Sequence, residues 1–165
     1  MIAVIPECYT NLAFGEFILK EWKYIYFHDK NQNIDRVIYK TKKLVENSKL
    51  KKCIIVIDKE TGTQHEEIVE GFITYMKRIY NLEKREISSG IYLYLKDKQK
   101  PIIIVFDPNI EEAFIKKLDP DVLTNKKKYK GKKGYQTFIK KLEKYTSSEI
   151  EEIRRIVKNT YFDQA

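Results

Sequence analysis

Residues 53–58 have the sequence Cys-Ile-Ile-Val-Ile-Asp, which is the strongest strand pattern in this chain. The unbroken apolar run is rich in β-branched side chains, which favour strands. A run without polar alternation is typical of a strand buried on both faces, as in a parallel sheet that helices cover on each side. The segment therefore predicts an α/β protein with this strand near the centre of its sheet.

Further strands and helices are expected to alternate around this segment. The other predicted strands are short and apolar, and they cover residues 2–5, 24–27, 91–95 and 102–106. The last two are separated by a polar turn and predict a hairpin or two neighbouring strands. Helical spacing of apolar residues predicts helices from Thr10 or Asn11, over 33–50, 64–80, 110–118 and 135–145, and from Ser147 or Ser148 to near the end.

These elements predict a doubly wound, mostly parallel sheet of four to five strands, flanked by helices and followed by a helical C-terminal extension. The length of 165 residues suits a single domain spanning residues 1–165. Within it, residues 1–118 are expected to form the α/β core, and residues 119–165 a basic loop and the C-terminal helices. In such sheets ligands bind beyond the carboxyl ends of the strands.

The composition favours a polyanionic partner. The formal net charge is +8, and clustered Lys and Arg attract phosphate backbones over long distances. A chain rich in Lys, Glu, Ile and Tyr is also typical of heat-adapted proteins, whose ion-pair networks raise both kinds of charge. Both interpretations of the charge stay open at this point.

Two cysteines, Cys8 and Cys53, are too few for a disulfide scaffold and lack the spacing of a zinc site. The N-terminal segment lacks the pattern of a signal peptide, and no run reaches membrane-spanning length. We therefore expect a cytoplasmic protein with no membrane partner. Trp22, Tyr161 and Phe162 are candidates for a contact with a second copy of the chain, and the apolar face of the last helix needs a cover.

Acidic residues follow three of the predicted strands. Glu7 follows the first strand, Asp58 and Glu60 follow the central one, and Asp107, Glu111 and Glu112 follow the strand at 102–106. If these strands are parallel neighbours, the carboxylates converge. Carboxylates that share a crevice repel one another, so a divalent cation is the usual reason to assemble them, and oxygen ligands favour Mg²⁺ or Mn²⁺. The alternative is that each acid caps or solubilises the helix after its strand.

These residues resemble the motifs of the Toprim domain of topoisomerases, primases and small nucleases. In that family a Glu closes the first strand, and a later hydrophobic strand ends in an acidic-x-acidic pair; Glu7, Asp58 and Glu60 match them here. The resemblance implies a catalytic acid or base at Glu7 and Mg²⁺ binding at the pair. This chain departs from the family in having Cys8 where a Gly often follows the Glu, and Asp-Lys-Glu in place of Asp-x-Asp.

A lysine-rich segment at residues 125–133, NKKKYKGKK, predicts an exposed loop. Lysines neutralise phosphates, and a tyrosine ring can stack on an unpaired base. The candidates for contact with nucleic acid are Lys126, Lys127, Lys128, Tyr129, Lys130, Lys132 and Lys133. The alternative is a solvated loop without a ligand.

The combined expectation is an Mg²⁺- or Mn²⁺-dependent enzyme that acts on phosphodiester bonds of nucleic acid. Glu7 is its expected catalytic residue, and the expected metal ligands are Asp58, Glu60, Asp107 and Glu112. The competing hypothesis is a catalytically degenerate α/β module that binds nucleic acid or a protein. Glycine-rich phosphate loops are absent, which weighs against a small-nucleotide enzyme, and His28 and His65 are expected to be ordinary surface or loop histidines.

Overall fold

The computed structural model describes residues 1–165 except 29–31, 48–49, 51, 99, 146 and 163–165. Its centre is a six-stranded mixed sheet in the order β2-β1-β3-β6-β5-β4. The strands are β1 (Ile2–Pro6), β2 (Tyr24–Tyr26), β3 (Cys53–Asp58), β4 (Glu83–Ser88), β5 (Ile91–Leu95) and β6 (Ile102–Phe106). The first three and β6 run parallel, whereas β5 and β4 are antiparallel.

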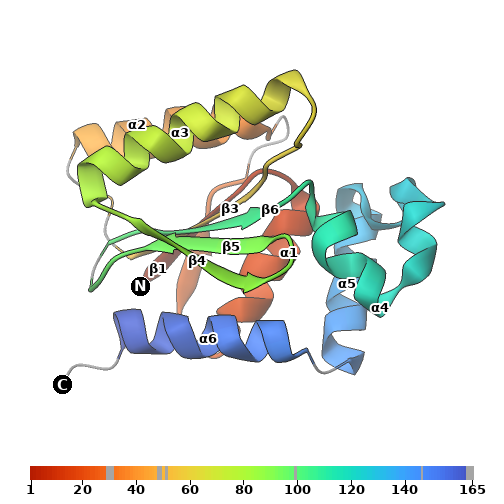
Figure 1. Ribbon diagram of the computed structural model, residues 1–165. Coiled ribbons are helices and arrows are strands. Elements are labelled where there is room, and N and C mark those ends of the chain that lie inside the picture. Colours follow the sequence, from red (N-terminus) through yellow and green to blue (C-terminus); the bar gives the residue numbers. More distant parts are fainter. Residues whose placement is uncertain (29–31, 48–49, 51, 99, 146, 163–165) are drawn as a thin grey trace.

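Helices cover both faces of the sheet (Figure 1). The helices are α1 (Tyr9–Ile18), α2 (Ile34–Glu46), α3 (Gln64–Tyr80), α4 (Lys116–Leu118), α5 (Gly131–Lys144) and α6 (Ser148–Tyr161). The α2 and α3 helices lie on one face, and α1 and α6 lie on the other. The resulting two cores explain why β3 is buried over its whole length, as its continuous apolar run predicts.

The predicted α/β class is confirmed, and the predicted count of four to five strands is wrong. The sixth strand is β4, whose sequence Glu-Lys-Arg-Glu-Ile-Ser is largely exposed at the edge of the sheet. Charged residues suit an unpaired edge because they discourage pairing with another chain. The hairpin expectation is confirmed, since β5 pairs antiparallel with β6.

The face of α6 packs against the sheet of its own chain. Ile150, Ile153 and Val157 belong to the same core as α1 and β3. Tyr161 is buried, with its hydroxyl oxygen 2.9 Å from the carbonyl oxygen of Cys53. The apolar face of α6 is therefore covered by the sheet and α1 of the same chain.

No helix in the described part of the chain is long and apolar enough to cross a membrane.

The segment 125–133 differs from the exposed loop that its lysines predict. Lys126–Tyr129 forms a 3-10 turn, and α5 begins at Gly131 rather than at Tyr135. Tyr129 is fully buried, and its carbonyl oxygen accepts a hydrogen bond of 2.6 Å from the Thr10 hydroxyl of α1. This turn is thus anchored in the core while its lysines remain outside.

A glycine permits this anchoring. A Cβ atom on Gly134 would lie 1.9 Å from the carbonyl carbon of Tyr129, so only glycine lets α5 approach the turn this closely. Gly71 in α3 has open space around it instead, because nothing lies within 4 Å of an added Cβ there.

We expect Gly134→Ala to lower the free energy of unfolding by about 1–3 kcal/mol, because the new methyl group forces α5 away from the Tyr129 backbone. Gly71→Ala is the matched control and should raise it by up to about 1 kcal/mol, since alanine is the better helix former. Urea denaturation of both variants measures the difference. Equal effects of the two substitutions would contradict the packing of α5 on the turn.

Candidate functional site

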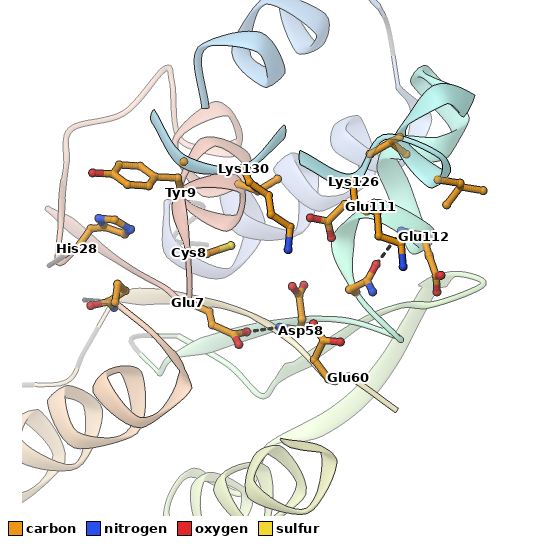
Figure 2. A pocket seen from close by; sticks show the side chains of 16 residues that line it. Glu7, Cys8, Tyr9, His28, Asp58, Glu60, Glu111, Glu112, Lys126 and Lys130 are labelled. Carbon is orange, nitrogen blue, oxygen red and sulfur yellow. Dashed lines mark hydrogen bonds between the residues drawn. The ribbon is translucent and has the colours of Figure 1, made fainter. Parts of the chain in front are cut away.

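A pocket of about 450 Å³ opens beyond the carboxyl ends of β1 and β3 (Figure 2). The acidic side chains in its wall come from three connections of the sheet, and they are Glu7, Asp58, Glu60, Glu111 and Glu112. Lys126 and Lys130 supply the positive charge of the wall. The position is the one at which α/β sheets bind ligands, because side chains from several strand ends meet there.

Asp58 is the most buried of these acids and joins three strand ends. Its Oδ1 accepts hydrogen bonds from the amide of Ile110, at 3.0 Å, and from the side chain of Asn11, at 3.3 Å. Burial raises its pKa well above the usual range, and the nearby carboxylates of Glu7 and Glu111 add to the rise. A negative charge at Asp58 therefore costs free energy unless a cation offsets it.

Glu7 lies next to Asp58 at the end of β1. Its Oε2 accepts a 2.8 Å hydrogen bond from the amide of Asp58, and its Oε1 lies 3.0 Å from Nε2 of His65 in the first turn of α3. Burial raises the pKa of Glu7 to about 7, against the lowering effect of the Asp58 amide. Its carboxyl group can thus exchange a proton near neutral pH, which suits a general acid or base.

The other three acids approach from the loops after β3 and β6. Glu60 has a φ of 55°, so the backbone turns sharply after β3, and its amide donates a 2.6 Å hydrogen bond to the Pro108 carbonyl. Glu111 and Glu112 begin a π-helical turn, Glu111–Ile115. Burial raises the pKa of Glu111, and the charge of Lys130 partly offsets this effect.

This donor set fits a hard divalent cation in its chemistry. Carboxylate oxygens are the ligands that Mg²⁺ and Mn²⁺ prefer. Among the residues that the structure describes, no group of three or more His, Cys, Asp or Glu side chains is placed to hold a metal ion. Mg²⁺ commonly keeps several waters and needs only one or two protein carboxylates beside substrate phosphates. An ion in this pocket would therefore have to be partly hydrated.

Asp107 does not belong with the other predicted metal ligands. It accepts a hydrogen bond from the Thr61 hydroxyl and lines a neighbouring pocket, which shares Glu112 with the first. The register explains this: Asp58 pairs with Phe106, so Asp107 lies one position further along. Successive side chains along a strand point to opposite faces, so Asp107 is directed away from Asp58.

The predicted lysines separate into two groups. Lys126 and Lys130 line the pocket, and Figure 2 shows Lys130 pointing toward Asp58. Lys128 instead forms a 2.5 Å ion pair with Asp119. The exposed side chains that do not line the pocket are Lys127, Lys132 and Lys133.

The expectation that Tyr129 stacks on a base is corrected by its burial. Its exposed fraction is 0%, and its hydroxyl donates a 2.6 Å hydrogen bond to Asp119. A ring enclosed on all sides has no face for a ligand. Its role is to hold the lysine-bearing turn against the protein.

Several residues of the pocket were not predicted as site residues from the sequence. Tyr9, His28, Asn11 and Asn109 contribute to the wall or its hydrogen bonds, and His65 contacts Glu7. Single histidines and asparagines carry no spacing signal. The one usable signal was position, since Tyr9 and Asn109 stand within two residues of the acids at two strand ends.

Comparison of the chain with protein-family models, curated proteins and solved structures yields no match.

Glu7 makes the stability of the metal-free protein depend on pH. The pKa of Glu7 is higher in the folded state, about 7 against an ordinary 4.5, so the folded state binds the proton more tightly. Its contribution is present below pH 4.5 and is lost as the pH rises through about 7. Glu7→Gln keeps an oxygen for the Asp58 amide and removes the charge. We therefore expect it to stabilise the protein above neutral pH and not under acidic conditions.

Thermal denaturation in the presence of a chelator, at several pH values, measures this effect. Glu67→Gln is the matched control, since it removes one exposed negative charge from α3. A constant difference between Glu7→Gln and the wild type across the pH range would contradict the buried, proton-binding state of Glu7.

Proposed function

We propose that this protein is a divalent-metal-dependent enzyme acting on phosphodiester bonds of nucleic acid, with Toprim-like chemistry in the pocket at the ends of β1 and β3. The observation that carries the proposal is the assembly of five carboxylates in one pocket, with Asp58 buried among them. Such an arrangement is unfavourable in the absence of a cation. Mg²⁺ or Mn²⁺ is the cofactor that suits its oxygen ligands best.

The contrast between the pocket and the whole chain supports a nucleic-acid substrate. The chain has a net charge of +8, which draws a polyanion toward it. The pocket wall has five acids and two lysines, and it would repel a phosphate that arrives alone. A bound divalent cation would offset most of this negative charge and would help the pocket to accept the phosphodiester.

Each side chain has a role in this proposal that follows from its position. Asp58 and Glu60 would hold a partly hydrated cation, which would polarise the phosphoryl oxygens when bound. Glu7 would take or give the proton at the attacking or leaving oxygen, because its pKa lies near neutral pH. Lys130 would contact a non-bridging phosphate oxygen from the opposite wall.

The second candidate is a module that keeps the fold and binds nucleic acid without cleaving it. The observation in its favour is that no three candidate ligands among the described side chains are placed to hold a metal ion. The Asp-Lys-Glu sequence at 58–60, in place of Asp-x-Asp, points the same way. Metal binding distinguishes the two candidates, since a module without a metal site gains no stability from the ion.

Asp58→Asn tests the proposed enzyme. Asparagine retains an oxygen for the Ile110 and Asn11 donors, so the fold should persist while the charge that attracts the cation is lost. We expect cleavage of DNA or RNA in the presence of Mg²⁺ or Mn²⁺ to fall about a hundredfold or more, and the Mn²⁺-induced rise in melting temperature to disappear.

Asp97→Asn is the control, because Asp97 lies in the turn after β5 with its side chain 62% exposed. It should retain both the cleavage and the thermal shift. Cleavage by Asp58→Asn at the wild-type rate would contradict the proposed site. A wild-type protein that binds nucleic acid but shows neither cleavage nor a metal-dependent shift would favour the second candidate.

Lys130→Ala tests the phosphate contact. Loss of one phosphate contact should weaken binding to every sequence alike, and it should reduce the slope of log affinity against log salt by about one. Lys127→Ala is the matched control, as Lys127 is exposed on the same segment and does not line the pocket. Fluorescence anisotropy over a range of salt concentrations measures both. An equal loss in both variants would show that the segment acts only through its total charge.

A further inference from the structure

The wall of the pocket is aromatic at one end. Tyr9 and His28 both line it, and their ring centroids lie 4.2 Å apart with the planes tilted by 47°. Tyr135 of α5 stands edge-on to Tyr9, with ring centroids 6.4 Å apart. Figure 2 shows the Tyr9 and His28 rings side by side, beyond Cys8 and away from Glu112.

We propose that the Tyr9 and His28 ring pair is a nucleobase subsite, so that the substrate is a nucleic-acid strand with an unpaired base next to the reacting phosphodiester. This inference rests on the proposed function for the phosphate end of the pocket. It adds the class of substrate, single strands and unpaired strand ends, which the carboxylates do not specify.

The chemistry of the rings supports a base as the ligand. Every nucleobase has a flat face that stacks on aromatic side chains, and this contact tolerates any sequence. A base inside a continuous duplex is already stacked and paired, so it cannot enter such a subsite without leaving the helix. The ring pair therefore favours a strand that is already unpaired.

The layout of the pocket supports a strand rather than a base alone. Lys130 and the carboxylates lie in the same pocket as the rings, so one cavity contacts both a base and its phosphate. A volume of about 450 Å³ falls within the size range of small-molecule sites and suits one nucleotide unit. The pocket is also only partly enclosed, which leaves the ends of a strand free to continue outward.

The subsite is held in place before any ligand arrives. Tyr9 is the first residue of α1, directly after the Glu7-Cys8 connection, so the ring and the catalytic carboxylate share a short, rigid link. On the other side, the Gln32 side chain donates a 2.7 Å hydrogen bond to the Pro6 carbonyl at the end of β1. The amide of Phe27 donates a 3.0 Å hydrogen bond to the Val4 carbonyl, which fixes the backbone next to His28.

Anisotropy of labelled oligonucleotides in the presence of a chelator tests the subsite without cleavage. The probes are single strands of about a dozen nucleotides, as DNA and as RNA, and the matching duplexes. We expect Tyr9→Leu to weaken binding to a single strand about tenfold, whereas Tyr9→Phe, the matched control, stays within about twofold because the ring is kept. Neither variant should change binding to the duplex.

A second variant, His28→Ala, covers the case in which Tyr9→Leu does not fold, and it should also weaken single-strand binding. Equal affinities of wild type and Tyr9→Leu for the DNA single strand and for the RNA single strand would overturn the subsite. A free nucleotide that binds as tightly as the single strand would also overturn it. The proposed function is judged separately, by cleavage in Mg²⁺ or Mn²⁺. Ring-dependent binding without cleavage would keep the subsite and reject the enzyme.

Discussion

Asp58 is the point at which the ends of three parallel strands are tied together. Its amide donates to Glu7 after β1, and its carboxylate accepts from the amide of Ile110 after β6. The pairing of β3 with β1 on one side and β6 on the other places these groups at one level of the sheet. The pocket, its charge and the raised pKa values of Glu7 and Asp58 all depend on this alignment, because a shift of one residue would direct the side chains to the opposite face.

The second requirement is a wall opposite the sheet, and α5 with the turn before it supplies that wall. Tyr129 is packed in the core, and Gly134 allows α5 to lie directly against it. Lys130 stands between these two anchors and is therefore held over the carboxylates rather than left on a free loop. The burial of the Tyr129 ring thus positions the neighbouring Lys130, which stays exposed to solvent at the wall of the pocket.

The electrostatics of the molecule are divided between its surface and its pocket. The chain as a whole has an excess of lysine and arginine, whereas the pocket concentrates acids, of which Glu7 and Asp58 have raised pKa values because they are buried. In the proposed function, a bound cation would make these acids favourable neighbours of a phosphate. The proposed base subsite at Tyr9 and His28 would then select strands with unpaired bases at the other end of the same cavity.

Local patterns in the sequence were enough to predict β3, the whole of α3 and the α/β class, because burial and helical periodicity are visible in neighbouring residues. The meeting of Glu7 with Asp58 and Glu60 was predicted only on the condition that their strands are parallel neighbours, which the pairing of β1 with β3 fulfils. The local patterns misplaced Asp107 and Tyr129. The direction of Asp107 depends on its register against β3, and the burial of Tyr129 depends on contacts with α1 and α5. The Tyr9 and His28 pair could not be predicted from the sequence either, since its two rings come from different connections of the sheet. Side chains distant along the chain acquire such relations only when strand pairing and packing bring them together.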